Sequence, residues 1–445
     1  MDAVRAGIDD LEIGAVGAQQ RSELIHSCVE RGRSNAHAGS VASLTMLAPM
    51  PTRFEPFESL AEVPYAALAE LRRSEPVALT PSGGFFLALQ DDVLAATKDI
   101  DTFIASFREP GVVVPDEEQL ISEIAEPRHG WMRRIINSVL APHAIAKAEP
   151  YIHDLCQRRL TDVLAAGGGE LVSEFIAPIP GTVIAHLAGV PEADVDKYIA
   201  WSDDVVRGDY ATKNRTDRGE GIAGGHPEFA AYIDDQIASC LTAANPPDDF
   251  ITRLLSTEID GRHLTPTEIR SQVIFLIISG NETTRHLIGN LLATVAVDAD
   301  LFARLRTDPA LIPMAVEESL RHDSPIHILI RNCGRNTSVR GVDICPGSKV
   351  VFGVASANRD ERFYDEPDRF QLGRPDPRQH VAFGGGPHVC PGASLARMEA
   401  RIALEVFVDR VESVSVVPGW HREKVPVFWA NGPSTLPVLL KPART

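Results

Sequence analysis

Apolar residues recur every three to four positions through most of residues 55–320, whereas shorter, alternating runs follow Arg321. The helical spacing is clearest in Tyr65 to Arg73, Tyr151 to Leu164 and Phe229 to Leu241. Such spacing is typical of helices that bury one face, so this part of the chain is predicted to be mainly helical. Two short β-like stretches interrupt it, at Val77 to Leu79 and Phe85 to Leu89.

The region after Arg321 has the pattern of short strands separated by proline and glycine. The predicted strands are Ile328 to Arg331, Val339 to Val342 and Val350 to Val354, followed by a turn-rich stretch from Asn358 to Gly386. One more helix is predicted at about Gly392 to Arg410, before a β-rich tail. The fold class is therefore mainly α with small β-sheets. Residues 1–50, rich in small and polar side chains towards their end, are predicted to be a loosely ordered N-terminal extension.

One predicted helix stands out by its length and its apolar middle. Thr265, Pro266 and Glu268 form a helix start with an N-cap, a proline in the first turn and a capping box. The helix is expected to reach about Asp298, and it has no charged residue between Ser271 and Asn281. A helix without charge on any side must be covered on most sides, so it is predicted to cross the core.

The composition fits a folded globular protein, with 44% hydrophobic and 23% charged residues in a chain of 445. The net charge of −18 argues against nucleic-acid binding through the whole surface, because like charge repels phosphate. The longest strongly apolar stretch, Val273 to Ile278, is far shorter than the ~20 residues of a membrane span. We therefore predict a cytoplasmic protein without a membrane anchor, since the acidic start also lacks the features of a signal peptide.

The strongest local signal is the segment from His380 to Gly392, in which three consecutive glycines precede Cys390 and the predicted last helix. Glycines let a backbone approach a flat group closely. A cysteine at a helix N-terminus is favoured as a thiolate, the form that binds metals. A glycine-rich turn beside a buried structural cysteine would explain this short pattern equally well.

The full segment resembles the haem-binding loop of the cytochrome P450 superfamily, Phe-Gly-x-Gly-x-His-x-Cys-x-Gly. The matching residues are Phe383, Gly384, Gly386, His388, Cys390 and Gly392. The resemblance implies that Cys390 is the axial ligand of haem b (iron protoporphyrin IX). It also implies that Phe383 packs beside the sulfur and that His388 lies near a haem propionate. Because the resemblance extends from about residue 54 to the end, residues 51–445 are expected to form a single cytochrome P450 catalytic domain.

Further segments match the same family. Glu318 and Arg321 resemble its Glu-x-x-Arg helix, with Arg369 expected as the third member of a structural cluster; taken alone, the pair would be a surface ion pair. His129, Arg133, Arg331 and His380 match family positions that bind the haem propionates, a role suited to charge-assisted hydrogen bonds. Any one of these cations alone would more often be solvated.

The long central helix resembles the family's oxygen-activating helix. Glu282 and Thr283 match its acid and alcohol, so they are the predicted catalytic residues, with the alcohol in a locally opened stretch of helix. Gly280 is expected to leave room for oxygen. A threonine bonded back to a helix carbonyl is the alternative that the residues alone would favour.

Helix spacing and the resemblance together predict a mostly apolar substrate pocket with two polar handles, Ser279 and His327. Its predicted members are Phe275, Ile278, Ser279, Ile326, His327 and Leu329, and residues 107–125 and 200–228 are expected to form the lid. The implied reaction is hydroxylation of a compact apolar metabolite (terpenoid, steroid, fatty acid or polyketide) with O2. Epoxidation, oxidative coupling and peroxygenase chemistry are alternatives, as is a haem sensor without turnover.

No glycine-rich nucleotide motif follows a strand in this chain, so the electrons are expected to come from outside. The resemblance implies NAD(P)H, ferredoxin reductase and ferredoxin as their source. Arg133, Arg134 and Arg401 are predicted to contribute to a local basic patch that binds an acidic ferredoxin.

Overall fold

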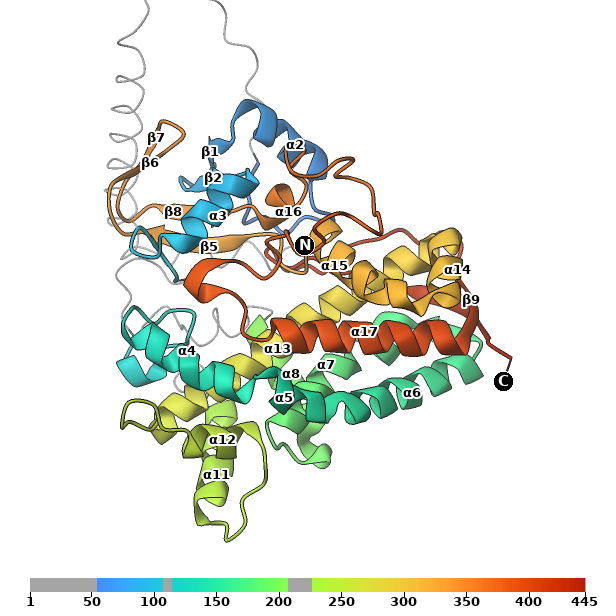
Figure 1. Ribbon diagram of the computed structural model, residues 1–445, viewed down its shortest axis with the longest axis horizontal. Coiled ribbons are helices and arrows are strands. Elements are labelled where there is room, and N and C mark those ends of the chain that lie inside the picture. Colours follow the sequence, from blue (N-terminus) through green and yellow to red (C-terminus); the bar gives the residue numbers. More distant parts are fainter. Residues whose placement is uncertain (1–53, 107–113, 207–225, 445) are drawn as a thin grey trace, which may run out of the picture.

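The computed structural model describes residues 54–106, 114–206 and 226–444 (Figure 1). The predicted N-terminal extension lies outside the described residues, as do positions 107–113 and 207–225 of the predicted lid. The α-helices are α2 Tyr65–Ser74, α3 Gln90–Lys98, α4 Arg128–Val139, α5 Pro142–Ile145, α6 Glu149–Ala165, α7 Pro178–Leu187, α8 Val195–Val206, α11 Pro227–Thr242, α12 Phe250–Ser256, α13 Pro266–Val297, α14 Ala299–Thr307, α15 Ile312–His322, α16 Val354–Ala357 and α17 Ala393–Arg410. The strands are β1 Val77–Leu79, β2 Phe85–Leu87, β3 Phe103–Ile104, β4 Gly168–Glu170, β5 Leu329–Cys333, β6 Thr337–Val339, β7 Val342–Ile344, β8 Lys349–Phe352, β9 Val411–Val416 and β10 Pro437–Pro442.

Most of the predicted elements are present, within a few residues of the predicted bounds. The largest sheet has the order β1-β2-β8-β5-β3, in which only β2 and β8 run parallel. In Figure 1 this sheet lies with α2, α3 and α16 above a layer of long helices that includes α6, α13 and α17. The molecule therefore divides into a β-rich part and a helical part, although the sequence has no linker between them.

The predicted strand Val339 to Val342 is wrong. Its middle is the turn of the β6–β7 hairpin, where Arg340 has φ +49° and Gly341 has φ +81°. Two consecutive residues with positive φ make the tight turn that fits the twist of a hairpin. The alternating pattern continued through the turn, so the sequence alone did not separate the two strands.

The long helix α13 has the predicted start. The Thr265 hydroxyl accepts a hydrogen bond from the Glu268 amide at 3.2 Å, and the Glu268 carboxylate accepts one from the Thr265 amide at 3.0 Å. The helix runs unbroken to Val297 and packs against α7, α8, α11, α15 and α17. It is therefore the central element of the helical part.

None of the described helices alone has both the length and the hydropathy of a membrane span. α13 and α14 reach them only as a pair bent by 105°.

Candidate active site

Cys390 lies between a short 3-10 turn, Gly386–His388, and the start of α17. Its amide donates to the Phe383 carbonyl at 2.9 Å, which closes the loop. Gly384 and Gly386 have φ +72° and +62°, and a β-carbon at Gly386 would overlap the Thr97 carbonyl oxygen of α3. These two positions therefore require glycine, as the sequence pattern predicted.

The surroundings of the Cys390 sulfur have opposing effects on its ionisation. Burial raises the pKa of the thiol, whereas the amides of Gly392 and Ala393 and the guanidinium groups of Arg133 and Arg397 lower it. The helix start and the two arginines thus supply positive potential at the sulfur. This is the electrostatic environment that a thiolate ligand needs.

A group of four basic side chains gathers near Cys390, and we call His129, Arg133, Arg331 and His388 the cationic group. The imidazole rings of His129 and His388 lie 4.1 Å apart. Burial, followed by the charges of His129, Arg331 and Arg133, lowers the pKa of His388 to about 4. The structure therefore brings together side chains from α4, β5 and the cysteine loop.

The cationic group has few anionic partners among the described residues. His129 Nδ1 donates to Glu126 at 3.0 Å, but its Nε2 is buried and has no hydrogen-bond partner in the part of the chain that the structure describes. Arg331 donates to the Ile330 carbonyl at 2.7 Å, and burial lowers its pKa to about 10. Arg133 donates to the Val389 carbonyl. A cation withdrawn from water without an acid is costly, so Arg133 and Arg331, with the open Nε2 of His129, fit an anionic ligand such as the two propionates of haem.

Near its middle, α13 has one side that is only half-buried, although most of the helix is buried. Its half-buried positions there are Phe275, Ile278, Ser279, Gly280 and Thr283, and their spacing places them along one side of the helix. Leu329 of β5 and the Cys390 loop are half-buried as well. Apolar side chains that other protein atoms do not fully cover can contact a bound cofactor and substrate.

Thr283 does not lie in an opened stretch of helix, contrary to the prediction. Its hydroxyl donates to the Ser279 carbonyl at 2.7 Å, and α13 continues through this point. A hydroxyl can satisfy the carbonyl four residues earlier without breaking the helix. Gly280 permits close packing instead, because a β-carbon there would lie 3.2 Å from Ile184 of α7.

Glu282 is buried and has two charged or polar neighbours on its own helix. It forms an ion pair with Arg285, and its Oε1 lies 2.8 Å from His286 Nε2. Arg285 also lies 3.4 Å from Asp203 of α8. Burial, followed by nearby cations, lowers the pKa of His286 to about 3, so this imidazole is neutral. His286 was missed in the sequence, although its position four residues after Glu282 was the available signal.

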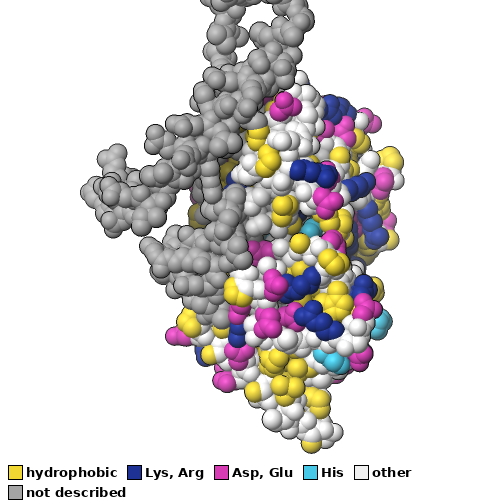
Figure 2. Space-filling view, turned by 90° about the vertical axis from the view of Figure 1, so that its left-hand side faces the viewer, with side chains coloured by type: hydrophobic (Ala, Val, Ile, Leu, Met, Phe, Trp, Pro, Cys, Tyr) yellow, Lys and Arg dark blue, Asp and Glu magenta, His cyan; other side chains and the backbone are white. Residues whose placement is uncertain are grey.

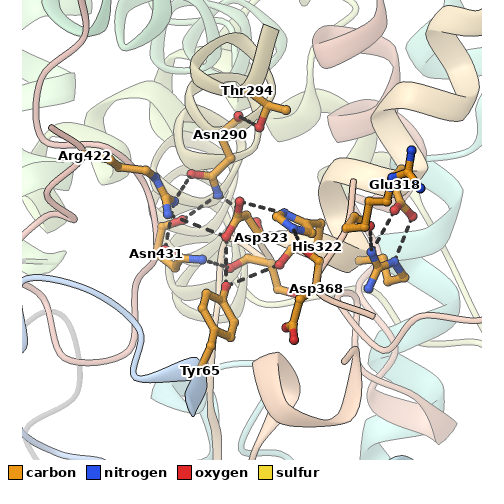
Figure 3. A network of polar contacts seen from close by, with 12 residues as sticks. Tyr65, Asn290, Thr294, Glu318, His322, Asp323, Asp368, Arg422 and Asn431 are labelled. Atoms are coloured by element: carbon orange, nitrogen blue, oxygen red, sulfur yellow. Dashed lines mark hydrogen bonds and ion pairs between the residues drawn. The ribbon is translucent and has the colours of Figure 1, made fainter. Parts of the chain in front are cut away.

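Glu318 and Arg321 are joined by two hydrogen bonds of 2.7 and 2.8 Å, both side chains being buried (Figure 3). The prediction that Arg369 completes this cluster is wrong. Arg369 is exposed and pairs with Glu366, whereas Arg374 reaches both Glu318 oxygens at 3.0 Å. The Arg369 carbonyl does accept a hydrogen bond from Arg321, so the chain passes close by while the side chain points away. We call Glu318, Arg321 and Arg374 the Glu318 cluster.

His380 also departs from its predicted role at a propionate. Its Nε2 lies 3.0 Å from Glu317, which additionally binds Arg397 at 2.6 Å. These partners hold the pKa of Glu317 down at about 2, although burial works to raise it. His380 thus has an acid partner of its own and does not belong to the cationic group.

The predicted pocket residues fall into two sets. Phe275, Ile278, Ser279 and Leu329 are half-buried. Ile326 is also half-buried and forms an isolated bridge with Ala430. His327 is buried, and burial followed by the charge of Lys424 lowers its pKa to about 3. Ser279 therefore remains the more accessible of the two predicted handles.

The predicted basic patch is largely neutralised by acids. Arg134 pairs with Asp260, and Arg401 pairs with Glu149 at 2.5 Å and Glu405 at 2.8 Å. Arg133 alone of the three has no acid partner among the described residues. Arg134 and Arg401 therefore contribute little net positive charge to the surface.

Comparison with known proteins agrees with the fold and the loop. The family model for cytochrome P450 matches residues 228–419. The steroid C26-monooxygenase of Mycobacterium tuberculosis (strain CDC 1551 / Oshkosh) is 30% identical over 360 residues, which cover 79% of this chain and 95% of that protein.

Two solved structures are similar over most of their length. Cytochrome P450 CYP109Q5 from Chondromyces apiculatus has a TM-score of 0.77 and 33% identity, covering 86% of this chain and 96% of the other. CYP109E1 from Bacillus megaterium, solved in complex with corticosterone, has a TM-score of 0.75 and 29% identity, covering 84% and 98%. The chain belongs to the cytochrome P450 family and is a cytochrome P450 monooxygenase, a haem enzyme. The predicted mainly α cytochrome P450 fold is confirmed.

Proposed function

We propose that the protein hydroxylates a compact, apolar, steroid-like metabolite at a haem held by Cys390. The observation that carries this proposal is the cationic group beside Cys390: among the described residues Arg133 and Arg331 have no acid partner, and His129 Nε2 has no hydrogen-bond partner. In this proposal His129, Arg133, Arg331 and His388 bind the propionates. Phe383, Gly384 and Gly392 shape the loop around the sulfur.

A haem bound through a thiolate supplies O2 activation. The residues of α13 handle the protons that this reaction consumes. Glu282, held by Arg285 and His286, releases a proton inward and regains one from solvent. Thr283, the next residue, moves a proton at Oγ1 once that hydroxyl leaves the Ser279 carbonyl. Intact acid and alcohol favour O2 over peroxide as the oxidant, because a peroxygenase does not need this relay.

A compact apolar substrate is supported by the half-buried side chains of Phe275, Ile278 and Leu329, with Ser279 as a polar contact. The names of two similar proteins mention steroid chemistry, one as a steroid C26-monooxygenase and one as a corticosterone complex. We therefore favour a steroid-like molecule over the fatty acids, terpenoids and polyketides that the pocket also admits.

Electrons are proposed to come from NAD(P)H through ferredoxin reductase and an external ferredoxin, with the protein acting in the cytoplasm. Raising the salt concentration should slow reduction by ferredoxin only slightly, because Arg134 and Arg401 are already paired. A steep salt dependence would instead point to a basic docking surface elsewhere.

The test has two stages. The reduced protein with carbon monoxide should show the Soret band typical of a thiolate ligand, and Cys390→Ser should lose it. Steroids should then produce the spin-state shift caused by displacing water, and turnover with ferredoxin and NAD(P)H should give a hydroxylated product. Ligand binding without product under reducing conditions would favour a haem sensor, and product formed only with peroxide would favour a peroxygenase.

A further inference from the structure

A second concentration of cations, of which Arg359 and Lys424 are buried, lies away from the Cys390 loop, around a cavity of about 230 Å³. The cavity lies where the start of α2, the end of α15 and the segment from Arg422 to Lys424 meet. Its charged lining consists of Arg359, Arg422, Lys424, Asp323 and, on the rim, the exposed Glu62. Figure 3 shows Tyr65, Arg422 and Asp323 converging here.

Asp323, the buried acid of this cavity, already has its full set of partners. It accepts hydrogen bonds from Tyr65 Oη at 2.8 Å and from His322 Nδ1 at 3.0 Å. Arg359 and Arg422 each lie 3.6 Å from its Oδ1. Burial works to raise the pKa of Asp323, but Arg422, His322 and Arg359 hold it well below its usual range. This carboxylate is ionised, and it is shared by two arginines.

Lys424 has no such partner. Lys424 is only 5% exposed, and its ammonium group donates to the carbonyls of Val425 at 3.2 Å and Val427 at 2.8 Å. Within residues 54–106, 114–206 and 226–444, no acid forms an ion pair with Lys424. An ammonium has three donors, so one remains after these two bonds.

Arg422 is held mainly by neutral groups. Its Nη2 donates to Asn290 at 2.7 Å and Asn431 at 3.1 Å, and its acid contact is the shared Asp323. The resulting positive potential reaches two buried imidazoles, since Lys424 contributes to the lowered pKa of both His286 and His327. Arg359 has a second acid partner, Asp368 at 3.0 Å, so the uncompensated charge of the cavity wall lies at Lys424 and beside Arg422.

We propose that this cavity is a binding site for a small oxyanion, a phosphate or carboxylate group held between Lys424 and Arg422. A buried ammonium bonded only to carbonyls is poorly compensated, and an oxyanion would accept its remaining donor. The same anion would accept from Arg422, whose guanidinium matches two oxygens at once. The site is separate from the proposed haem site and does not rest on the proposed function.

The direct test is calorimetric titration of the full-length haem protein with inorganic phosphate and, separately, with acetate, in chloride buffer at constant ionic strength. We expect saturable binding of one anion per chain. Lys424→Gln and Arg422→Gln should each weaken it about tenfold or more, the usual effect of losing a charge-assisted hydrogen bond. Lys424→Arg should retain binding. Lys441→Gln is the matched control, because Lys441 is exposed and pairs with Glu412, and it should bind as the parent does.

The two anions distinguish the sources of the ligand. Saturable binding of phosphate alone supports a phosphate ligand, and binding of acetate as well supports a carboxylate. Circular dichroism checks that each variant is folded, and if Lys424→Gln does not fold, Arg422→Gln decides. The proposal is overturned if neither anion binds saturably, or if a folded glutamine variant binds as tightly as the parent and Lys441→Gln.

Discussion

The Glu318 cluster and the cationic group both hold arginines that are at least partly withdrawn from water, but these arginines differ in their partners. In the Glu318 cluster, Arg321 and Arg374 each contact the carboxylate at 3.0 Å or less. In the cationic group, the contacts of Arg133 and Arg331 among the described residues are backbone carbonyls. Complete pairing indicates a group that stabilises the fold, whereas missing acids indicate a group that awaits a ligand.

This difference predicts opposite effects of removing a cation. In the paired cluster, removal leaves a buried acid short of partners and weakens the fold. In the unpaired group, removal relieves a buried charge and weakens only the ligand complex. Stability and ligand binding can therefore be measured separately on the two groups.

The largest expected effect is that of Arg321→Met. The change leaves the buried Glu318 with Arg374 as its one cation beside the Gln371 amide, so the free energy of unfolding should fall by about 3 kcal/mol or more. Denaturant unfolding followed by circular dichroism measures it. Arg374→Met should act in the same direction, while Arg369→Ala, at an exposed side chain, should change stability by less than about 0.5 kcal/mol. A large loss for Arg369→Ala would restore the original assignment of the third residue.

The next effect is expected from Arg331→Met, in the cationic group. Haem should be released faster by about tenfold or more, because a charged hydrogen bond to a propionate is lost. The apoprotein should be as stable as the parent or more stable, since a buried cation is removed. Haem transfer to a scavenging globin and thermal unfolding of the apoprotein measure the two quantities. Destabilised apoprotein with unchanged haem release would mean that Arg331 is structural.

His327 lies in the region of excess positive charge around Lys424, which gives a prediction about pH. Its folded-state pKa of about 3 lies below the unfolded value of about 6.5, so the unfolded chain binds a proton that the folded chain does not. Stability is therefore lost as pH falls from about 6.5 towards 3, by up to about 1.4 kcal/mol per pH unit for this group. His327→Gln should flatten the stability profile between pH 4 and 6 relative to the exposed control His421→Gln. Parallel profiles for the two variants would contradict the assignment.

The sequence predicted those parts of the site that local spacing determines. The glycines, Cys390 and the Glu318–Arg321 pair follow from positions a few residues apart, and the capping box located the start of α13. Arg374 and the Glu317 partner of His380 could not be found in this way, because contacts made across turns depend on where the chain goes next. The β6–β7 turn was also missed, because an alternating hydrophobic pattern does not indicate where residues adopt positive φ.

The smallest predicted effect concerns Pro391, which follows Cys390 and has no amide proton to donate. The amides of Gly392 and Ala393 already act on the sulfur, so Pro391→Leu would offer it one more donor. An added hydrogen bond withdraws electron density from the thiolate and should raise the reduction potential of the iron. The rise should be on the order of 50 mV, since one net hydrogen bond is about 1 kcal/mol and about 59 mV corresponds to a tenfold change for one electron. Spectroelectrochemical titration measures it against Pro387→Ala, in the 3-10 turn before the ligand. If both variants shift equally, or neither shifts, the amide at position 391 does not tune the sulfur.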